Sequence, residues 1–112
     1  MQITAAQVAI MRKHSEEAFV RRVVRFIAEQ QNLPASEPSL RARCEDLVQR
    51  ARSFGFETEF EVATFVMSGF TFGMDFDRQE GLPPHQILID LEIEPQIKAE
   101  RLSVVLDEFD RR

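Results

Sequence analysis

The side chains of this chain that could do chemistry are few and lie far apart. His14, Cys44 and His85 fall in three different segments, so none of them forms the i, i+4 pair or the short Cys/His spacing that binds zinc. We therefore predict no zinc site. Because Cys44 is the only cysteine, no disulfide can form within the chain.

Asp75, Asp77 and Glu80 come nearest to an oxygen-ligand site for a metal ion. A calcium loop places its ligands at alternate positions around a central glycine and ends on a bidentate glutamate. Only Asp75 and Asp77 are in that register here. We therefore predict that this segment is a solvated turn and that it binds no metal.

Nucleophilic catalysis finds no support in the sequence either. Cys44 falls on the apolar side of a predicted helix, which is typical of a small core residue. The four glycines, at positions 55, 69, 73 and 81, are too scattered to form a phosphate-binding loop. We therefore predict no catalytic residues, no cofactor and no enzymatic activity.

The elements that would position these residues are all predicted to be helices. Capping, proline and glycine signals delimit five segments, at about residues 4–31, 39–54, 59–72, 83–91 and 96–111. Thr58 and Glu61 open the third segment with the spacing of a capping box. The fold class is therefore all-α. We expect a single domain over residues 1–112, a bundle of about five helices with a long N-terminal helix.

Helical periodicity also predicts which side chains face the core. The third segment is apolar on nearly every side, so it is either central to the core or meets a partner on one side. In the other long segments the inward positions are Val8, Met11, Phe19, Val20, Val23, Val24, Phe26 and Ile27 in the first, Leu40, Cys44, Leu47, Val48 and Ala51 in the second, and Ile97, Leu102, Val105, Leu106 and Phe109 in the last.

Phenylalanine is concentrated in the middle of the chain. Seven of the ten Phe residues fall between Phe54 and Phe76, while Trp and Tyr are absent. Core packing accounts for Phe60 and Phe65, but a domain of this size has difficulty burying all seven. Some of these rings are therefore candidates for contact with another protein.

The best candidates border the loop that follows the third segment. We predict that Phe70, Phe72 and Phe76, together with Asp75 and Asp77, form a protein-binding surface, because exposed aromatic side chains are good interface anchors. Acidic residues surround these rings, so the partner is expected to be basic there. The alternative is that the whole cluster is core.

The charge of the chain is uneven and excludes some functions. The net charge is −5, but the residues up to Arg52 carry nine Lys/Arg against six Asp/Glu, and those from Ser53 onward carry five against thirteen. The acidic second half disfavours nucleic acid. No apolar run reaches the roughly 18 residues of a membrane span, and no signal peptide is recognisable. We expect a cytoplasmic protein that binds neither nucleic acid nor membrane.

The order of motifs in the middle of the chain is distinctive. A basic helix end and an aromatic-Gly pair span residues 50–56, the Thr58-Glu59 cap and an apolar helix follow, and residues 72–77 read Phe-Gly-Met-Asp-Phe-Asp. This order resembles a group of small bacterial proteins encoded beside type VI secretion spike-tip, adaptor and toxin genes. The chain departs from that group at Phe54, where relatives often have Tyr, and at His85, where a Trp is expected.

The resemblance implies an accessory role in secretion. The protein would be a co-chaperone or adaptor in loading a type VI secretion toxin, and its partners would be the secreted toxin, the adaptor chaperone of that toxin, or both. An immunity protein that binds and neutralises a cognate bacterial toxin is the alternative. The resemblance carries over no catalytic residue, and it leaves a homodimer open.

Overall fold

The computed structural model of the protein describes residues 5–34 and 36–110, with side chains at 16–34 and 36–109. The described chain forms helices and no strand, which confirms the all-α prediction. The helices are α1 (Ala5–Gln31), α2 (Pro38–Ser53), α3 (Glu59–Phe72), α4 (Pro83–Ile89) and α5 (Pro95–Asp110). They match the five segments predicted from capping signals to within a few residues.

The side chains of the first helix are described only in its second half, from Glu16 onward. The predicted cap at Thr4 and the inward positions Val8 and Met11 lie outside the residues whose side chains are described, and the prediction that this helix is long depends on them. From Glu16 onward the predicted face is largely confirmed. Phe19, Val20, Val23, Val24 and Ile27 are all buried.

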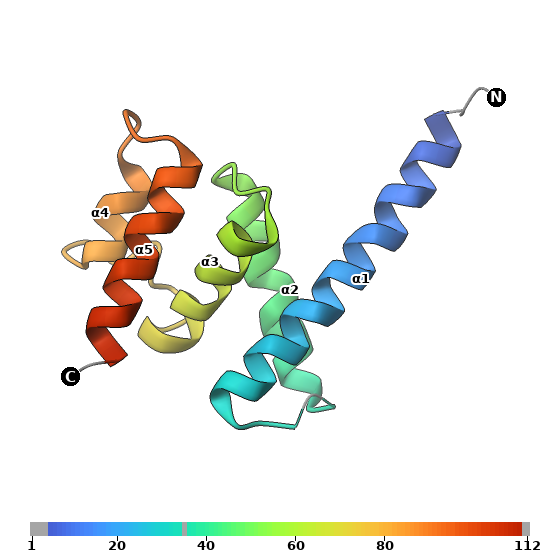
Figure 1. The fold of residues 1–112 in the computed structure, drawn as a ribbon, viewed down its shortest axis with the longest axis horizontal. Helices are drawn as coiled ribbons and strands as arrows, with labels where there is room; N and C mark the ends of the chain where they lie inside the picture. The colour runs from blue at the N-terminus through green and yellow to red at the C-terminus, as the bar shows by residue number, and fades with distance from the viewer. Residues whose placement is uncertain (1–4, 35, 111–112) are drawn as a thin grey trace.

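α3 lies at the centre of the arrangement (Figure 1). α1 and α2 form an antiparallel pair on one side of it, and α5 lies on the other side with α4 beyond. α3 and α5 run parallel: Gly55, just before α3, lies beside Pro95 at the start of α5, and Phe72 meets Phe109 near their ends. The molecule measures 20 Å along its shortest axis.

The start of α3 is fixed by the predicted capping box, with one difference. Thr58 Oγ1 accepts a hydrogen bond from the Glu61 N–H at 3.2 Å. The Glu61 carboxylate reaches back and accepts from the N–H of Glu57 at 2.9 Å, one residue earlier than a standard capping box. Gly73, at φ 116°, ends the helix in a conformation that favours glycine.

The core is built around the ring of Phe65. Its centroid lies 5.7 Å from that of Phe54, 5.8 Å from that of Phe56 and 4.9 Å from that of Phe76. These partners come from the end of α2, the turn before α3 and the loop after it. Much of the Phe-rich segment is therefore core, as the alternative interpretation had it.

Four aromatic or aliphatic residues expected in the core are instead exposed. Phe26 of α1 is 41% exposed, whereas its neighbour Ile27 is fully buried. Phe60 is the second residue of α3 and points away from α2, with 54% of it exposed. Ile97 and Phe109 of α5 are similarly exposed, because α3 and α4 cover only part of that helix.

The short helix α4 is held by a buried lysine of α5. Lys98 is buried, and its Nζ donates a hydrogen bond to the carbonyl of Leu88 at 2.7 Å. Free carbonyls at a helix C-terminus attract a cation, which here satisfies one of them. α4 has only seven residues, and so short a helix is not stable by itself. The contact with Lys98 and the burial of Pro84 and Leu88 stabilise it.

A close contact between α2 and α3 supplies the first prediction. A Cβ on Gly69 would lie 2.7 Å from both Cδ atoms of the buried Leu47. We expect Gly69→Ala to lower the free energy of unfolding by about 1–3 kcal/mol through overpacking. In a Leu47→Ala background the same change should stabilise the protein by up to about 1 kcal/mol, because only the higher helix propensity of alanine remains. Urea unfolding of the four proteins measures both values, and a penalty of equal size in the two backgrounds contradicts the packing explanation.

Candidate protein-binding site

The structure buries two of the five residues that were predicted to form a protein-binding surface around the loop after α3. Phe76 has no exposed surface and packs edge-on against Phe65, so it cannot anchor a partner. Asp77 is buried as well, whereas Asp75 is exposed. The segment is a turn, as predicted, but it is solvated at Asp75 and not at Asp77.

The buried carboxylate of Asp77 has a structural role. Its Oδ1 accepts from Nη1 of Arg50 at 2.7 Å, and the second terminal nitrogen of Arg50 donates to the Met74 carbonyl. The Asp77 carbonyl lies 2.7 Å from Nδ1 of His85, at the start of α4. Arg50 thus fastens the loop after α3 to the last turn of α2. The aspartate that looked like a recognition residue in the sequence keeps this loop in place.

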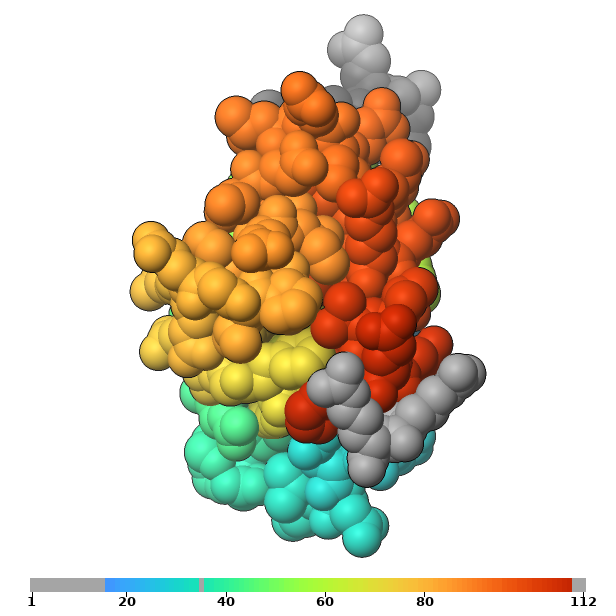
Figure 2. Space-filling view, turned by 90° about the vertical axis from the view of Figure 1, so that its left-hand side faces the viewer, coloured from blue at the N-terminus to red at the C-terminus, as the bar shows by residue number. Residues whose placement is uncertain are grey.

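The two remaining aromatic candidates are only half-buried. The guanidinium of Arg43 lies 4.3 Å from the centroid of the Phe70 ring and covers one of its faces. Phe72 meets Phe109 edge-to-face, with ring centroids 5.3 Å apart. Phe72 and Phe109 line a recess of about 280 Å³ together with Leu82, Pro83, Pro84, Val105 and Glu108. This recess opens between the ends of α3 and α5 and the start of α4, elements that Figure 2 shows in yellow, red and light orange.

A second apolar groove, of about 250 Å³, lies along α3. Its floor is α3, and its two walls come from α1 and α5. Phe26 and Phe60, the two most exposed phenylalanines outside the Phe109 recess, both contribute to it. The lining residues are Phe26 and Gln30 of α1, Phe60, Ala63, Thr64 and Met67 of α3, and Ser103, Leu106 and Asp107 of α5. We call this surface the α3 groove.

Only an indirect signal in the sequence points to the α3 groove. The third segment is apolar on nearly every side, which allows a partner on one of them. Periodicity alone cannot say which side neighbouring helices leave uncovered, so it places Phe26 and Phe60 in the core. The lining of the α3 groove by α5 depends on a helix about forty residues further along the chain.

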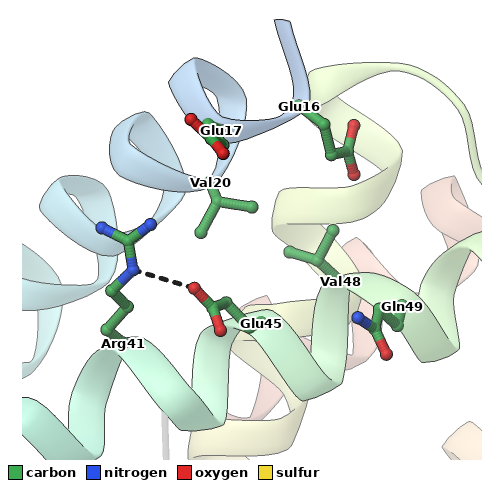
Figure 3. A pocket seen from close by; sticks show the side chains of 7 residues that line it. All are labelled: Glu16, Glu17, Val20, Arg41, Glu45, Val48 and Gln49. Carbon is green, nitrogen blue, oxygen red and sulfur yellow. Dashed lines mark hydrogen bonds and ion pairs between the residues drawn. The ribbon is translucent and has the colours of Figure 1, made fainter. Parts of the chain in front are cut away.

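The third recess, between α1 and α2, is lined by apolar and charged side chains together (Figure 3). Val20 and Val48 form its apolar floor, and its volume is about 220 Å³. Arg41 and Glu45 are paired with each other at its rim, with Nε to Oε1 at 2.8 Å. Glu16, which also lines it, is paired with Arg52 at 3.1 Å. Three of the four charged side chains that line this cleft, Glu16, Arg41 and Glu45, are thus already paired.

Few of the residues suited to catalysis or metal binding lie together. Within residues 16–34 and 36–109, no three His, Cys, Asp or Glu side chains lie close enough to hold a metal ion. Cys44 is fully buried, as predicted, and burial raises the pKa of its thiol to about 11. In the described part of the chain, none of the helices has the length and apolarity that crossing a bilayer requires.

Comparison with known proteins adds no relative to this picture. No protein-family model, no curated protein and no solved structure matches the chain. The resemblance to type VI secretion accessory proteins therefore stays an expectation from the sequence. The described residues form a small helical protein with apolar recesses between its helices.

The ion pair at the loop gives the second prediction. Asp77→Ala removes the buried carboxylate partner of the part-buried Arg50 guanidinium, which keeps the exposed Asp46 at 3.2 Å, and we expect the free energy of unfolding to fall by about 1.5–3 kcal/mol. Asp75→Ala is the matched control, because this neighbouring carboxylate is exposed and should change stability by less than about 0.5 kcal/mol. Chemical denaturation of both variants checks this, and equal losses contradict a special role for Asp77.

The thiol gives the third prediction. At pH 8–9 the folded protein should keep Cys44 protonated and shielded, so a disulfide reagent should label it only as fast as the chain opens. Because the pKa of Cys44 is raised by folding, this group favours the folded state fully below pH 8.5 and loses that contribution as the pH approaches 11. Labelling rates with and without denaturant test the point, and rapid labelling of the folded protein overturns it.

Proposed function

We propose that the protein acts by binding another protein and catalyses nothing. The observation that carries this proposal is the α3 groove, where Phe26 and Phe60 are left 41% and 54% exposed in an apolar recess between three helices. Aromatic residues and methionine are enriched in protein interfaces, and the α3 groove contains two Phe and Met67. An uncovered surface of this kind is typical of an interaction site.

The size and chemistry of the recesses favour a protein over a small molecule. Their volumes, from about 220 to 280 Å³, fall below the roughly 300–1,000 Å³ of ordinary small-molecule sites. The α3 groove contains one ionisable side chain, Asp107, and no histidine or cysteine. It thus offers contact area and no pair of groups that could exchange protons with a substrate.

The sequence resemblance suggests which process this binding serves. We propose a co-chaperone or adaptor that helps to load a type VI secretion toxin, acting in the bacterial cytoplasm before secretion. The acidic second half of the chain, which includes α3 and α5, suits a partner with a basic surface. Binding of the toxin domain alone, in the manner of an immunity protein, is the alternative that the experiment must separate.

The decisive experiment is affinity purification of the tagged chain from its source organism, with the bound proteins identified by mass spectrometry. A co-chaperone should recover a toxin together with its adaptor, and deletion of the gene should abolish toxin delivery. Recovery of a toxin domain alone, with protection of recipient cells, supports the immunity role. Recovery of neither protein contradicts both roles.

The fourth prediction compares two phenylalanines of the same helix. Phe60→Ala should weaken partner binding by about 2 kcal/mol or more while changing the free energy of unfolding by less than about 1 kcal/mol, because its ring is exposed. Phe65→Ala should instead cost about 3–5 kcal/mol of stability, because its ring is at the centre of the core. Thermal melts and quantitative pull-down measure the two effects. If Phe60→Ala retains full binding, the interface lies elsewhere.

A further inference from the structure

The α3 groove has the shape of a place for one more helix. Its floor residues Phe60, Ala63, Thr64 and Met67 follow the i, i+3, i+4, i+7 spacing of one helix face. Each wall also presents residues about one turn apart, with Phe26 and Gln30 on α1 and Ser103, Leu106 and Asp107 on α5. Ridges at these spacings are the ones into which the side chains of another helix pack.

The three helices around the α3 groove form an incomplete bundle. α1 and α5 flank α3 without covering its outer side, which is why Phe60 and Met67 are not buried. A helix lying over α3 between the two walls would bury both side chains and Phe26. An extended strand has no sheet edge to join here, because the described residues contain no strand.

The charges around the α3 groove select the chemistry of the incoming helix. Arg22, one turn before Phe26, is already paired with Glu59, with Nε to Oε1 at 2.8 Å. Asp107 lines the groove, and Glu29 and Glu100 are exposed about one turn from lining residues. Among the described residues none of these three carboxylates forms an ion pair. The one ionisable side chain that lines the groove, Asp107, is therefore acidic and free to pair with lysine or arginine beside an apolar stripe.

We propose that the α3 groove binds a single amphipathic helix of the partner protein, with an apolar stripe at i, i+3/i+4, i+7 spacing and cationic residues on both sides of that stripe. This inference rests on the proposed function, because it specifies the segment that a partner would present. It commits the protein to helix-in-groove recognition, in which a few apolar anchors give affinity and the charges set orientation.

The test uses a defined probe, so that it does not depend on finding the natural partner. The probe is a fluorescently labelled, Ala-rich peptide of about 15 residues with Leu at i, i+4 and i+7 and Lys on both sides of the stripe. A second peptide has Glu in place of every Lys, and a third has the Lys peptide's composition in scrambled order. Fluorescence anisotropy with the full chain measures each affinity.

We expect saturable binding of the Lys peptide, at least about tenfold weaker binding of the other two, and loss of affinity as salt rises from about 50 to 300 mM. Phe60→Ala and Phe26→Ala should each weaken binding of the Lys peptide by about tenfold or more. Leu91→Ala is the matched control: Leu91 is 95% exposed between α4 and α5, outside the α3 groove, and its loss should change the affinity by less than about twofold. Asp107→Asn should reduce the salt dependence.

Several outcomes overturn the inference. The inference fails if the Lys peptide does not bind or if the Glu peptide binds equally well. It also fails if Phe109→Ala removes binding while Phe60→Ala does not, because that result moves the site to the other recess. If Phe60→Ala proves unfolded in a thermal melt, Phe26→Ala decides the matter alone. Capture of a natural partner that is lost in Phe60→Ala, together with no peptide binding, leaves the proposed function standing and rejects only the helix.

Discussion

The packing of Phe65 against three other rings is the contact on which the rest of this structure depends. Phe54, Phe56 and Phe76 reach it from the end of α2, the turn before α3 and the loop after it, with centroids 4.9 to 5.8 Å away. This cluster commits one side of α3 to α2 and to the loop. α1 and α5 also pack against α3, and the groove lies between them, where Phe60 and Met67 are left uncovered. The uncovered groove therefore follows from the way the core is assembled, and it requires no special loop.

Local signals in the sequence were enough to predict the helices, whereas the site depended on contacts between distant segments. Thr58 and Glu61 specify the start of α3 within four residues of chain. Nothing near Asp77 reveals that its carboxylate will be buried, because the partner, Arg50, lies 27 residues earlier. Phe60 is the reverse case. Its apolar character predicts burial, but no helix covers it, so its ring is exposed. Periodicity defines the faces of a helix but does not say which of them a neighbour covers.

The basic residues of the first half of the chain are largely used in holding the protein together. Arg22, Arg41, Arg50 and Arg52 are all paired with carboxylates, three of them on other elements. Arg43 and Arg52 also lie against the rings of Phe70 and Phe19. Two of these pairs, Arg22–Glu59 and Arg50–Asp77, use carboxylates of the second half, so they offset part of the positive excess before residue 53. The acidic excess of the second half is less compensated, so it dominates the surface that a partner meets.

Because α3 and α5 run parallel, the α3 groove is completed late in the synthesis of the chain. Two parallel neighbours need a crossover, which the loop after α3 and α4 supply (Figure 1). A nascent chain that has released α1, α2 and α3 from the ribosome already presents Phe26 and Phe60, but it lacks Ser103, Leu106 and Asp107. The binding proposed for the α3 groove therefore waits until α5 has been synthesised and has docked, and a chain stalled before that point exposes an apolar helix face.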